Sequence, residues 1–334
     1  MQYKGIVIYP EELSDYWLDR IGECGINFLG SHPMGGNLQG KPIEDAIVWI
    51  KKPETQRLLQ KAERLGIVVE YEMHALSWLL PRDMFSEHPN WFRMDENGVR
   101  TNDYNCCASN EQALQYISRR AAELAQIFKT TTGRYHFWTD DVPSPKCLCP
   151  ECSKITASDE AMKIYNAINE GIRSVYPDAK QSYLAYDNMI TAPQNVKPDE
   201  GIYLEFAPML RNLTRPLCDP ESEMNKKAVE PVEGLIKVFG TKDSQVLDYW
   251  LDNSWFSDWR MPIRRFAFSP DIVAFDSAWY EKQGFETITS FGIYLGEEYY
   301  NRYGEHFDIA AYSKALGAIS EQNSDKTAQK AENK

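Results

Sequence analysis

The residues Ile26–Trp78 decide the fold. They begin with the strand-like run INFLGSHP (26–33), continue through a helical segment (42–65) that Gly66 ends, and close with the strand-like run IVVEYEMHALSW (67–78). Two parallel strands cannot be joined by a tight turn, so they need a crossover connection, usually a helix. This stretch therefore predicts a parallel sheet that is covered by helices.

The same alternation runs along nearly the whole chain. Strand-like runs are expected at residues 4–9, 26–33, 67–78, 135–141, 181–186, 201–208, 244–253 and 287–296. Helices are expected at residues 10–25, 42–65, 110–129, 159–177 with Ser158 as its cap, 229–239, 269–283 and 308–320. About eight such units predict an α/β fold, a (β/α)8 TIM barrel with inserted loops, over residues 1–322.

The alternative to a barrel is an open doubly wound sheet. That fold usually carries a glycine-rich phosphate turn after its first strand, whereas here the first strand is followed by YPEELS. The long loop at residues 79–109 is of a length that usually has a function. Residues 323–334 are polar and are expected to be a disordered tail.

Composition narrows the class of partner. The net charge of -13 and the pI of about 5.0 argue against nucleic acid and anionic membranes as partners. No apolar run approaches the ~20 residues of a membrane span, and the first residues do not have the pattern of a signal peptide. We therefore expect a cytoplasmic protein, with a trimmed secreted protein as the alternative. The sequence does not determine the oligomeric state and is compatible with a homo-oligomer.

Carboxylates and aromatic rings collect at the carboxyl ends of the expected strands, where barrel enzymes place their chemistry. Carboxylates accept hydrogen bonds from hydroxyl groups and rings cover the apolar face of a sugar, so this lining predicts a carbohydrate ligand. For Glu205 the alternative is a salt bridge buried inside the barrel. The expected sugar contacts are His32, Glu72, His74, Trp138, Tyr186, Asn188, Glu205, Tyr249, Trp250, Asp252, Asn253 and Tyr294.

Two neighbouring acids, Asp140 and Asp141, end the fourth expected strand. If both lean into one pocket, their repulsion raises one pKa and leaves one protonated acid beside one carboxylate. Hydrolysis of a glycosidic bond requires this division, because one group protonates the leaving oxygen and a second supports the cationic centre. The alternative is a pair that caps the turn before Pro143.

Three cysteines, Cys147, Cys149 and Cys152, follow with the spacing C-x-C-x2-C. Thiolates at this spacing hold Zn²⁺, which prefers four ligands, and we take Cys107 as the fourth. Cys106, His32 and His74 are the other candidates for that position. Such a metal would be structural and would pin the loop beside Asp141, and no cofactor is expected for catalysis. Free thiols, a disulfide and a catalytic zinc are the alternatives.

Four stretches carry a resemblance to a known family. They are FWTDDVPSPKCLCPECSKITASDEAMKIYNAINEGI, LAYDNMITAPQNVKPDEGIYLEFAPMLRN, LDYWLDNSWFS and TSFGIYLG. Together they resemble DUF4838, a bacterial family of uncharacterised barrel proteins that is often found with carbohydrate-degradation genes. That family is distantly similar to glycoside hydrolase families 84 and 20. The resemblance implies that Asp140 polarises the nitrogen of a 2-acetamido group and that Asp141 is the general acid/base.

The sequence thus predicts a glycosidase that is exo-acting, retaining and assisted by the acetamido group of its substrate. In a second interpretation the acetamido group takes no part in the reaction, and carboxylates on two strands carry it out, such as Asp141 with Glu205 or Asp252. A third is a barrel that binds carbohydrate without catalysis.

Overall fold

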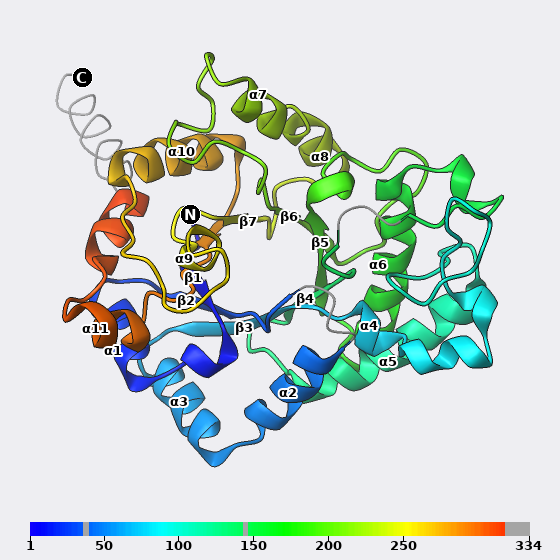
Figure 1. Cartoon of the computed structure of the whole chain (residues 1–334), viewed down its shortest axis with the longest axis horizontal. Coiled ribbons are helices and arrows are strands. Elements are labelled where there is room, and N and C mark those ends of the chain that lie inside the picture. Colours follow the sequence, from blue (N-terminus) through cyan, green and yellow to red (C-terminus); the bar gives the residue numbers. More distant parts are fainter. Residues whose placement is uncertain (36–39, 143–145, 318–334) are drawn as a thin grey trace, which may run out of the picture.

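The computed structural model describes residues 1–35, 40–142 and 146–317. Eight parallel strands form a closed barrel in which each strand pairs with the next and β8 pairs with β1 (Figure 1). The strands are β1 (Tyr3–Ile8), β2 (Phe28–Ser31), β3 (Val68–His74), β4 (Arg134–Trp138), β5 (Lys180–Ala185), β6 (Ile202–Phe206), β7 (Gln245–Asp248) and β8 (Thr287–Ser290). The predicted (β/α)8 barrel is confirmed, and each expected strand-like run overlaps one of these strands.

Helices lie around the ring of strands, as Figure 1 shows for α2, α3, α5, α6, α8 and α10. Their bounds are α1 (Asp15–Glu23), α2 (Lys41–Ile50), α3 (Pro53–Arg64), α4 (Leu76–Leu79), α5 (Glu111–Ile127), α6 (Ala157–Val175), α7 (Glu223–Val229), α8 (Val232–Phe239), α9 (Asn253–Phe256), α10 (Pro270–Gln283) and α11 (Glu297–Tyr303). Residues 309–317 are also helical, whereas residues 318–320 of the last expected helix and the predicted tail at 323–334 lie outside the described residues. No helix of the described residues has both the length and the apolar character needed to cross a membrane.

Three local expectations are corrected. The single helix expected at residues 42–65 is divided into α2 and α3, because Pro53 has no N–H to continue a helix and begins α3 instead. The cap of α6 is Thr156 rather than Ser158: Thr156 Oγ1 accepts from the Asp159 backbone N–H at 3.0 Å, and the Asp159 side chain accepts from the Thr156 backbone N–H in return. The helices α7 and α11 were not expected, and α4 and α9 begin within runs that were expected to be strands.

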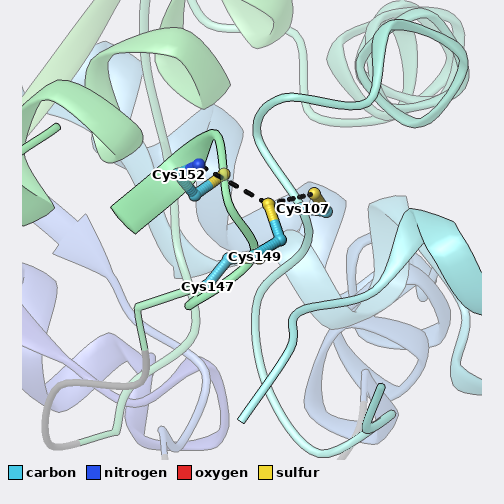
Figure 2. A group of neighbouring side chains, drawn as sticks. All are labelled: Cys107, Cys147, Cys149 and Cys152. Atoms are coloured by element: carbon cyan, nitrogen blue, oxygen red, sulfur yellow. Dashed lines mark hydrogen bonds between the residues drawn. The ribbon is translucent and has the colours of Figure 1, made fainter. Parts of the chain in front are cut away.

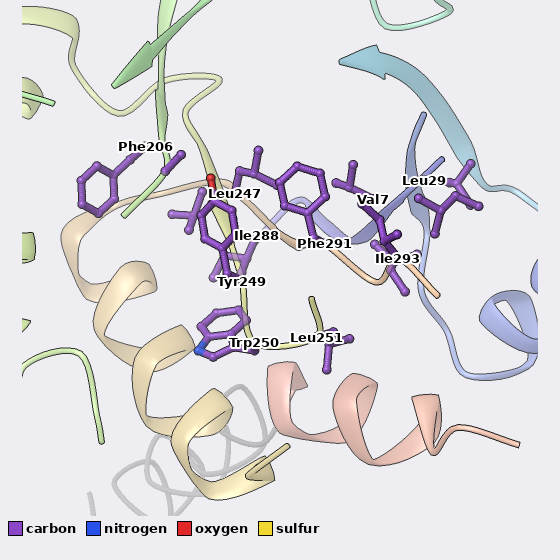
Figure 3. Close-up of a cluster of buried hydrophobic side chains, with 14 of the residues drawn as sticks. Val7, Leu29, Phe206, Leu247, Tyr249, Trp250, Leu251, Ile288, Phe291 and Ile293 are labelled. Carbon is purple, nitrogen blue, oxygen red and sulfur yellow. The ribbon is translucent and has the colours of Figure 1, made fainter. Parts of the chain in front are cut away.

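Apolar side chains of neighbouring strands pack into one large buried cluster. In Figure 3, Val7 and Leu29 from β1 and β2 lie with Leu247 and Ile288 from β7 and β8 in this cluster. Each is almost fully removed from solvent, which stabilises the fold by ~1.5–3 kcal/mol per side chain. This cluster holds the strand ends, and with them the site described next, in fixed positions.

Candidate functional site

A cavity of about 350 Å³ lies at the carboxyl ends of the barrel strands. Its walls are mainly aromatic and apolar, and within the described part of the chain its lining contains two acids, Asp141 and Asp252. The lining residues are Tyr9, His32, Met34, Gly35, His74, Trp138, Asp141, Leu184, Tyr186, Met209, Leu247, Tyr249, Asp252, Ser254, Trp259, Phe291 and Ile293. A small cavity with ring faces and two carboxylates suits a compact, hydroxylated ligand.

Asp141 follows β4 and points into this cavity with 32% of its side chain exposed. Tyr186 Oη donates a hydrogen bond to Asp141 Oδ1 at 3.3 Å, and His74 Nε2 lies 4.0 Å from the same oxygen. A Cβ placed on Gly35 would lie only 2.5 Å from Asp141 Oδ2, so a larger residue at this position would displace the Asp141 carboxylate. Asp141 is therefore held on several sides while its carboxylate stays open to the cavity.

Asp140 does not line the 350 Å³ cavity, which corrects the expectation that both acids lean into one ligand pocket; both acids line a separate hollow of about 20 Å³ instead. Its Oδ1 accepts from the backbone N–H and the hydroxyl of Ser77, at 2.9 and 2.6 Å. Its Oδ2 accepts from the Asn105 backbone N–H at 2.6 Å and forms a buried ion pair with Arg82. Arg82 therefore compensates the buried charge of Asp140.

Six of the predicted sugar contacts line the cavity: His32, His74, Trp138, Tyr186, Tyr249 and Asp252. Burial and the neighbouring His74 lower the pKa of His32 to about 3, so the His32 ring is neutral. The carbonyl of Thr139 can only accept the 2.7 Å bond to His74 Nδ1, so that nitrogen of His74 carries the hydrogen. Burial also raises the pKa of Asp252. Whether these groups bind a sugar stays a prediction.

Four other predicted contacts lie elsewhere. Trp250 lines a neighbouring cleft, and Tyr294 lies outside the cavity lining. Asn253 is fully buried and its Nδ2 donates to the carbonyls of Arg264 and Tyr294, both at 3.2 Å, so it joins two loops. Asn188 lines a separate cavity of about 20 Å³ behind the strand end. For these four a direct contact with a ligand in the 350 Å³ cavity is not supported.

Glu72 and Glu205 are fully buried inside the barrel, so the prediction that they contact a sugar is wrong. Gln245 Nε2 donates to one oxygen of each, at 2.9 Å in both cases. His136 Nδ1 donates to Glu205 Oε2 at 2.8 Å, and His136 Nε2 donates to Glu70 Oε2 at 2.6 Å. For Glu205, the buried salt bridge considered as its alternative is the arrangement found.

The charges of this interior network balance at neutral pH. Burial opposes a charge on His136, but Glu205 and Glu70 outweigh burial and raise the His136 pKa to about 10. Burial, with the charge of Glu205, raises the pKa of Glu72 to about 8. Two cations, His136 and Arg134, therefore face two carboxylates while Glu72 is protonated. Although Glu72, His136 and Glu205 lie close enough to hold a metal ion, both ring nitrogens of His136 carry hydrogens and offer no lone pair.

Because of this network, we expect the free energy of unfolding to decrease as the pH rises. The substitution Glu72→Gln should remove part of this decrease. In the unfolded chain Glu72 loses its proton near its ordinary pKa of 4.5, whereas in the folded chain it keeps the proton up to about pH 8. The unfolded state thus binds fewer protons between these values, and folding is progressively disfavoured. Glutamine imitates the protonated acid, so urea unfolding should show the variant gaining on wild type by on the order of a few kcal/mol between pH 5 and pH 8.

The matched control is Glu70→Gln, the same chemical change two residues earlier on β3. It removes the partner of Arg134 and His136, so it should lower the free energy of unfolding at every pH tested. His136 contributes equally to the pH dependence of wild type and Glu72→Gln, so it cancels in their difference. A difference that stays constant from pH 5 to pH 8 would contradict a protonated Glu72.

The four cysteines predicted as metal ligands lie together. Cys107 comes from the loop between β3 and α5, and Cys147, Cys149 and Cys152 come from the loop between β4 and α6. All four are buried, and their sulfurs lie within 4.8 Å of one another. Figure 2 shows the sulfur of Cys107 facing that of Cys149, 3.7 Å away. Cys106 packs into a different apolar cluster, so Cys107 completes the set.

Sequence reasoning missed several residues of the site. Phe291 directly follows β8, so the rule that barrel sites lie at the carboxyl ends of strands could have found it. Met209 and Trp259 lie in long loops, and no local pattern marks them. Arg82 lies 58 residues before Asp140 in the chain, so only the folded structure reveals the pair.

A larger cleft of about 1120 Å³ adjoins the cavity and shares Tyr249 and Asp252 with it. Trp250, Trp255 and Phe256 are among the aromatic residues in its walls. Tyr249 and Asp252 therefore lie between the cavity and an aromatic surface.

Similar folds occur among solved structures. A β-galactosidase from the psychrophilic Marinomonas ef1 has a TM-score of 0.54 and 12% identity, covering 98% of this chain and 60% of that one. A mutant of the Thermobaculum terrenum O-GlcNAc hydrolase has a TM-score of 0.53 and 10% identity, covering 96% and 63%. A trimodular GH5_4 endoglucanase has a TM-score of 0.52 and 9% identity, covering 95% and 60%. The chain thus spans about 60% of the length of these proteins, and identities this low show the barrel fold alone.

The sequence itself gives a closer assignment. No curated protein matches it at a significant level. Residues 48–252, more than half of the chain, match the family model described as "Domain of unknown function (DUF4838)". The chain therefore belongs to the DUF4838 family.

Proposed function

We propose that this protein is an exo-acting glycoside hydrolase in which Asp141 is the general acid/base. The observation that carries the proposal is the position of Asp141, whose carboxylate projects from the carboxyl end of β4 into the 350 Å³ cavity. Barrel enzymes place catalytic groups at this end of their strands. The cavity lies near the small end of the volumes typical of ligand sites, which favours one sugar unit at the end of a chain.

The groups around Asp141 support this role. Tyr186 donates to Asp141 Oδ1, and burial together with the charge of Asp141 raises the Tyr186 pKa, so the phenol keeps its hydrogen. The donor therefore remains in place while Asp141 gains or loses a proton. Trp138 and Tyr249 line the same cavity and offer ring surfaces to a sugar. Asp140, anchored by its own four donors, acts here as a positioning residue.

Asp141 needs a second group to complete the reaction, and Asp252 is the favoured one. Asp252 lies just beyond the end of β7 and lines the same cavity, whereas Asp140 does not line it. Two carboxylates from different strands can act on opposite faces of a sugar ring. The second candidate is the substrate's own acetamido oxygen, as in the families that carry an adjacent Asp pair. In that case Asp141 would protonate the leaving oxygen while the acetamido oxygen attacks the anomeric carbon.

A panel of nitrophenyl glycosides with and without a 2-acetamido group tests the proposal on wild type, Asp141→Asn and Asp252→Asn. In Asp252→Asn the new amide oxygen can still accept the hydrogen bonds that Ser254 and Trp255 donate to the native carboxylate, so the start of α9 should be kept. We expect wild type to hydrolyse at least one substrate and Asp141→Asn to lose that activity. If wild type hydrolyses glycosides without an acetamido group and Asp252→Asn loses that activity, the scheme with two carboxylates is favoured. If wild type hydrolyses only the acetamido substrates, assistance by the acetamido group is favoured. Sugar binding without turnover of any substrate would instead indicate a carbohydrate-binding barrel.

A further inference from the structure

We propose that Cys107, Cys147, Cys149 and Cys152 bind one Zn²⁺ ion, and that this ion fastens the loop after β3 to the loop after β4. Its position beside the anchor of Asp140 makes it a structural support of the candidate active site. The binding of the metal is argued from the cysteines alone. Its effect on catalysis rests on the proposed function.

The sulfur positions fit tetrahedral zinc. Four thiolates at the usual Zn–S distance of about 2.3 Å lie about 3.8 Å from one another at the corners of a tetrahedron. Cys107 Sγ and Cys149 Sγ are 3.7 Å apart, and all four sulfurs lie within 4.8 Å of one another. The four cysteines are free thiols. With four protein ligands no coordination position is left for water, and none of the four lines the 350 Å³ cavity, so the site is structural.

Hydrogen-bond donors point at these sulfurs. The Met94 backbone N–H donates to Cys147 Sγ at 3.3 Å, and the Cys152 backbone N–H donates to Cys149 Sγ at 3.5 Å. Arg100 Nη1 lies 3.7 Å from Cys147 Sγ. In metal sites, residues that hydrogen-bond to the ligands orient them and adjust their charge. The donors named here can orient the four sulfurs in the same way and stabilise them as thiolates.

The charge of the bound state also favours a divalent ion. Cysteine binds Zn²⁺ as the thiolate, so binding removes the protons of the four buried thiols and places a divalent cation among the resulting negative charges. The Arg100 guanidinium, with Nη1 at 3.7 Å from Cys147 Sγ, offsets part of the charge that remains.

The metal connects to Asp140 through a short path. Cys107 lies two residues after Asn105, whose backbone N–H donates to Asp140 Oδ2 at 2.6 Å and whose Oδ1 accepts from the Asp140 backbone N–H at 2.9 Å. Asn105 has a φ of 46°, a conformation that non-glycine residues seldom adopt and that the surrounding contacts must hold. Fixing Cys107 thus keeps Asn105, and with it the backbone that carries Asp141, in place.

Metal analysis of the purified full chain tests the binding. We expect one zinc per chain in wild type, loss of that zinc in Cys149→Ser, and retention in Cys218→Ser, a half-buried cysteine outside the cluster. If Cys149→Ser does not fold, chelator-stripped wild type titrated with Zn²⁺ should bind one equivalent, and Co²⁺ in its place should give the charge-transfer absorption of a tetrahedral thiolate site. A metal-free wild type that binds neither ion, or a mass lower by four hydrogens from two disulfides, would overturn the proposal.

Hydrogen exchange and activity test the support of the site separately. Stripping zinc should accelerate exchange of the Asn105 amide at least 10-fold while the far-ultraviolet circular dichroism of the barrel is unchanged, and Zn²⁺ should restore protection. If zinc binds but no glycoside is hydrolysed, the metal site stands and the proposed function fails. If zinc binds but its removal alters neither exchange at Asn105 nor an established activity, the role in supporting the site is wrong.

Discussion

Replacing Asp141 with Asn should reduce kcat for the best glycoside substrate by about 10²–10⁴-fold, the range for loss of a general acid/base. The amide has nearly the same shape and can still accept the bond from Tyr186, but it cannot transfer a proton. Asp141 is partly exposed and carries no ion pair closer than the 4.0 Å contact to His74 among the described residues, so the melting temperature should change by only a few degrees. Steady-state kinetics and thermal unfolding measure the two effects side by side.

Two variants separate proton transfer from positioning. Tyr186→Phe removes a single hydrogen bond to Asp141, so kcat should fall by about 3- to 10-fold only. Asp19→Asn changes an exposed acid on α1 that pairs with Lys61 and does not line the cavity, so it should leave kcat unchanged. If Asp141→Asn keeps kcat within threefold of wild type while Tyr186→Phe loses more, Asp141 is not the acid/base.

Arg82→Met should lower the free energy of unfolding by about 3–5 kcal/mol at neutral pH. The side chains of Arg82 and Asp140 are each 6% exposed, so the substitution leaves a buried carboxylate without its cation. It also removes the bonds from Arg82 to the Ser77 hydroxyl at 2.8 Å and to the Asn105 carbonyl at 2.7 Å. Urea unfolding with a fixed m-value measures the loss.

A second substitution shows whether the unpaired charge is the cause. Asp140→Asn in the Arg82→Met background removes the buried charge and should recover part of the lost stability. Arg57→Met breaks a pair with Asp15 whose side chains are 45% and 50% exposed, so its loss of stability should be far smaller than that of Arg82→Met. Equal losses in Arg82→Met and Arg57→Met would mean that the Arg82–Asp140 pair is exposed to water in solution.

The barrel could be predicted because each strand leaves a local signal. Runs such as residues 67–78 are apolar, are bounded by glycine or proline, and alternate with helical segments, and that order along the chain is enough to predict a parallel sheet. The cysteine cluster was likewise visible, because Cys147, Cys149 and Cys152 lie within six residues.

The depth of a side chain in the barrel could not be predicted in this way. Glu72 and His74 both face inward from β3, yet Glu72 is enclosed in the interior network and His74 lines the cavity two residues later. Alternation tells which face a residue occupies but not how far along the barrel axis the cavity begins. The direction of Asp140 was hidden for a different reason, since its partner Arg82 comes from a distant loop.

The interior network of the barrel also limits how this chain can be divided or recombined. Glu70, Arg134 and His136 belong to the first four strands, and Glu205 belongs to the sixth. Separated halves would each hold an unmatched charge at neutral pH, positive in the first and negative in the second. Such halves should fold poorly alone, and grafting either onto an unrelated barrel should fail unless the compensating residue is transplanted with it.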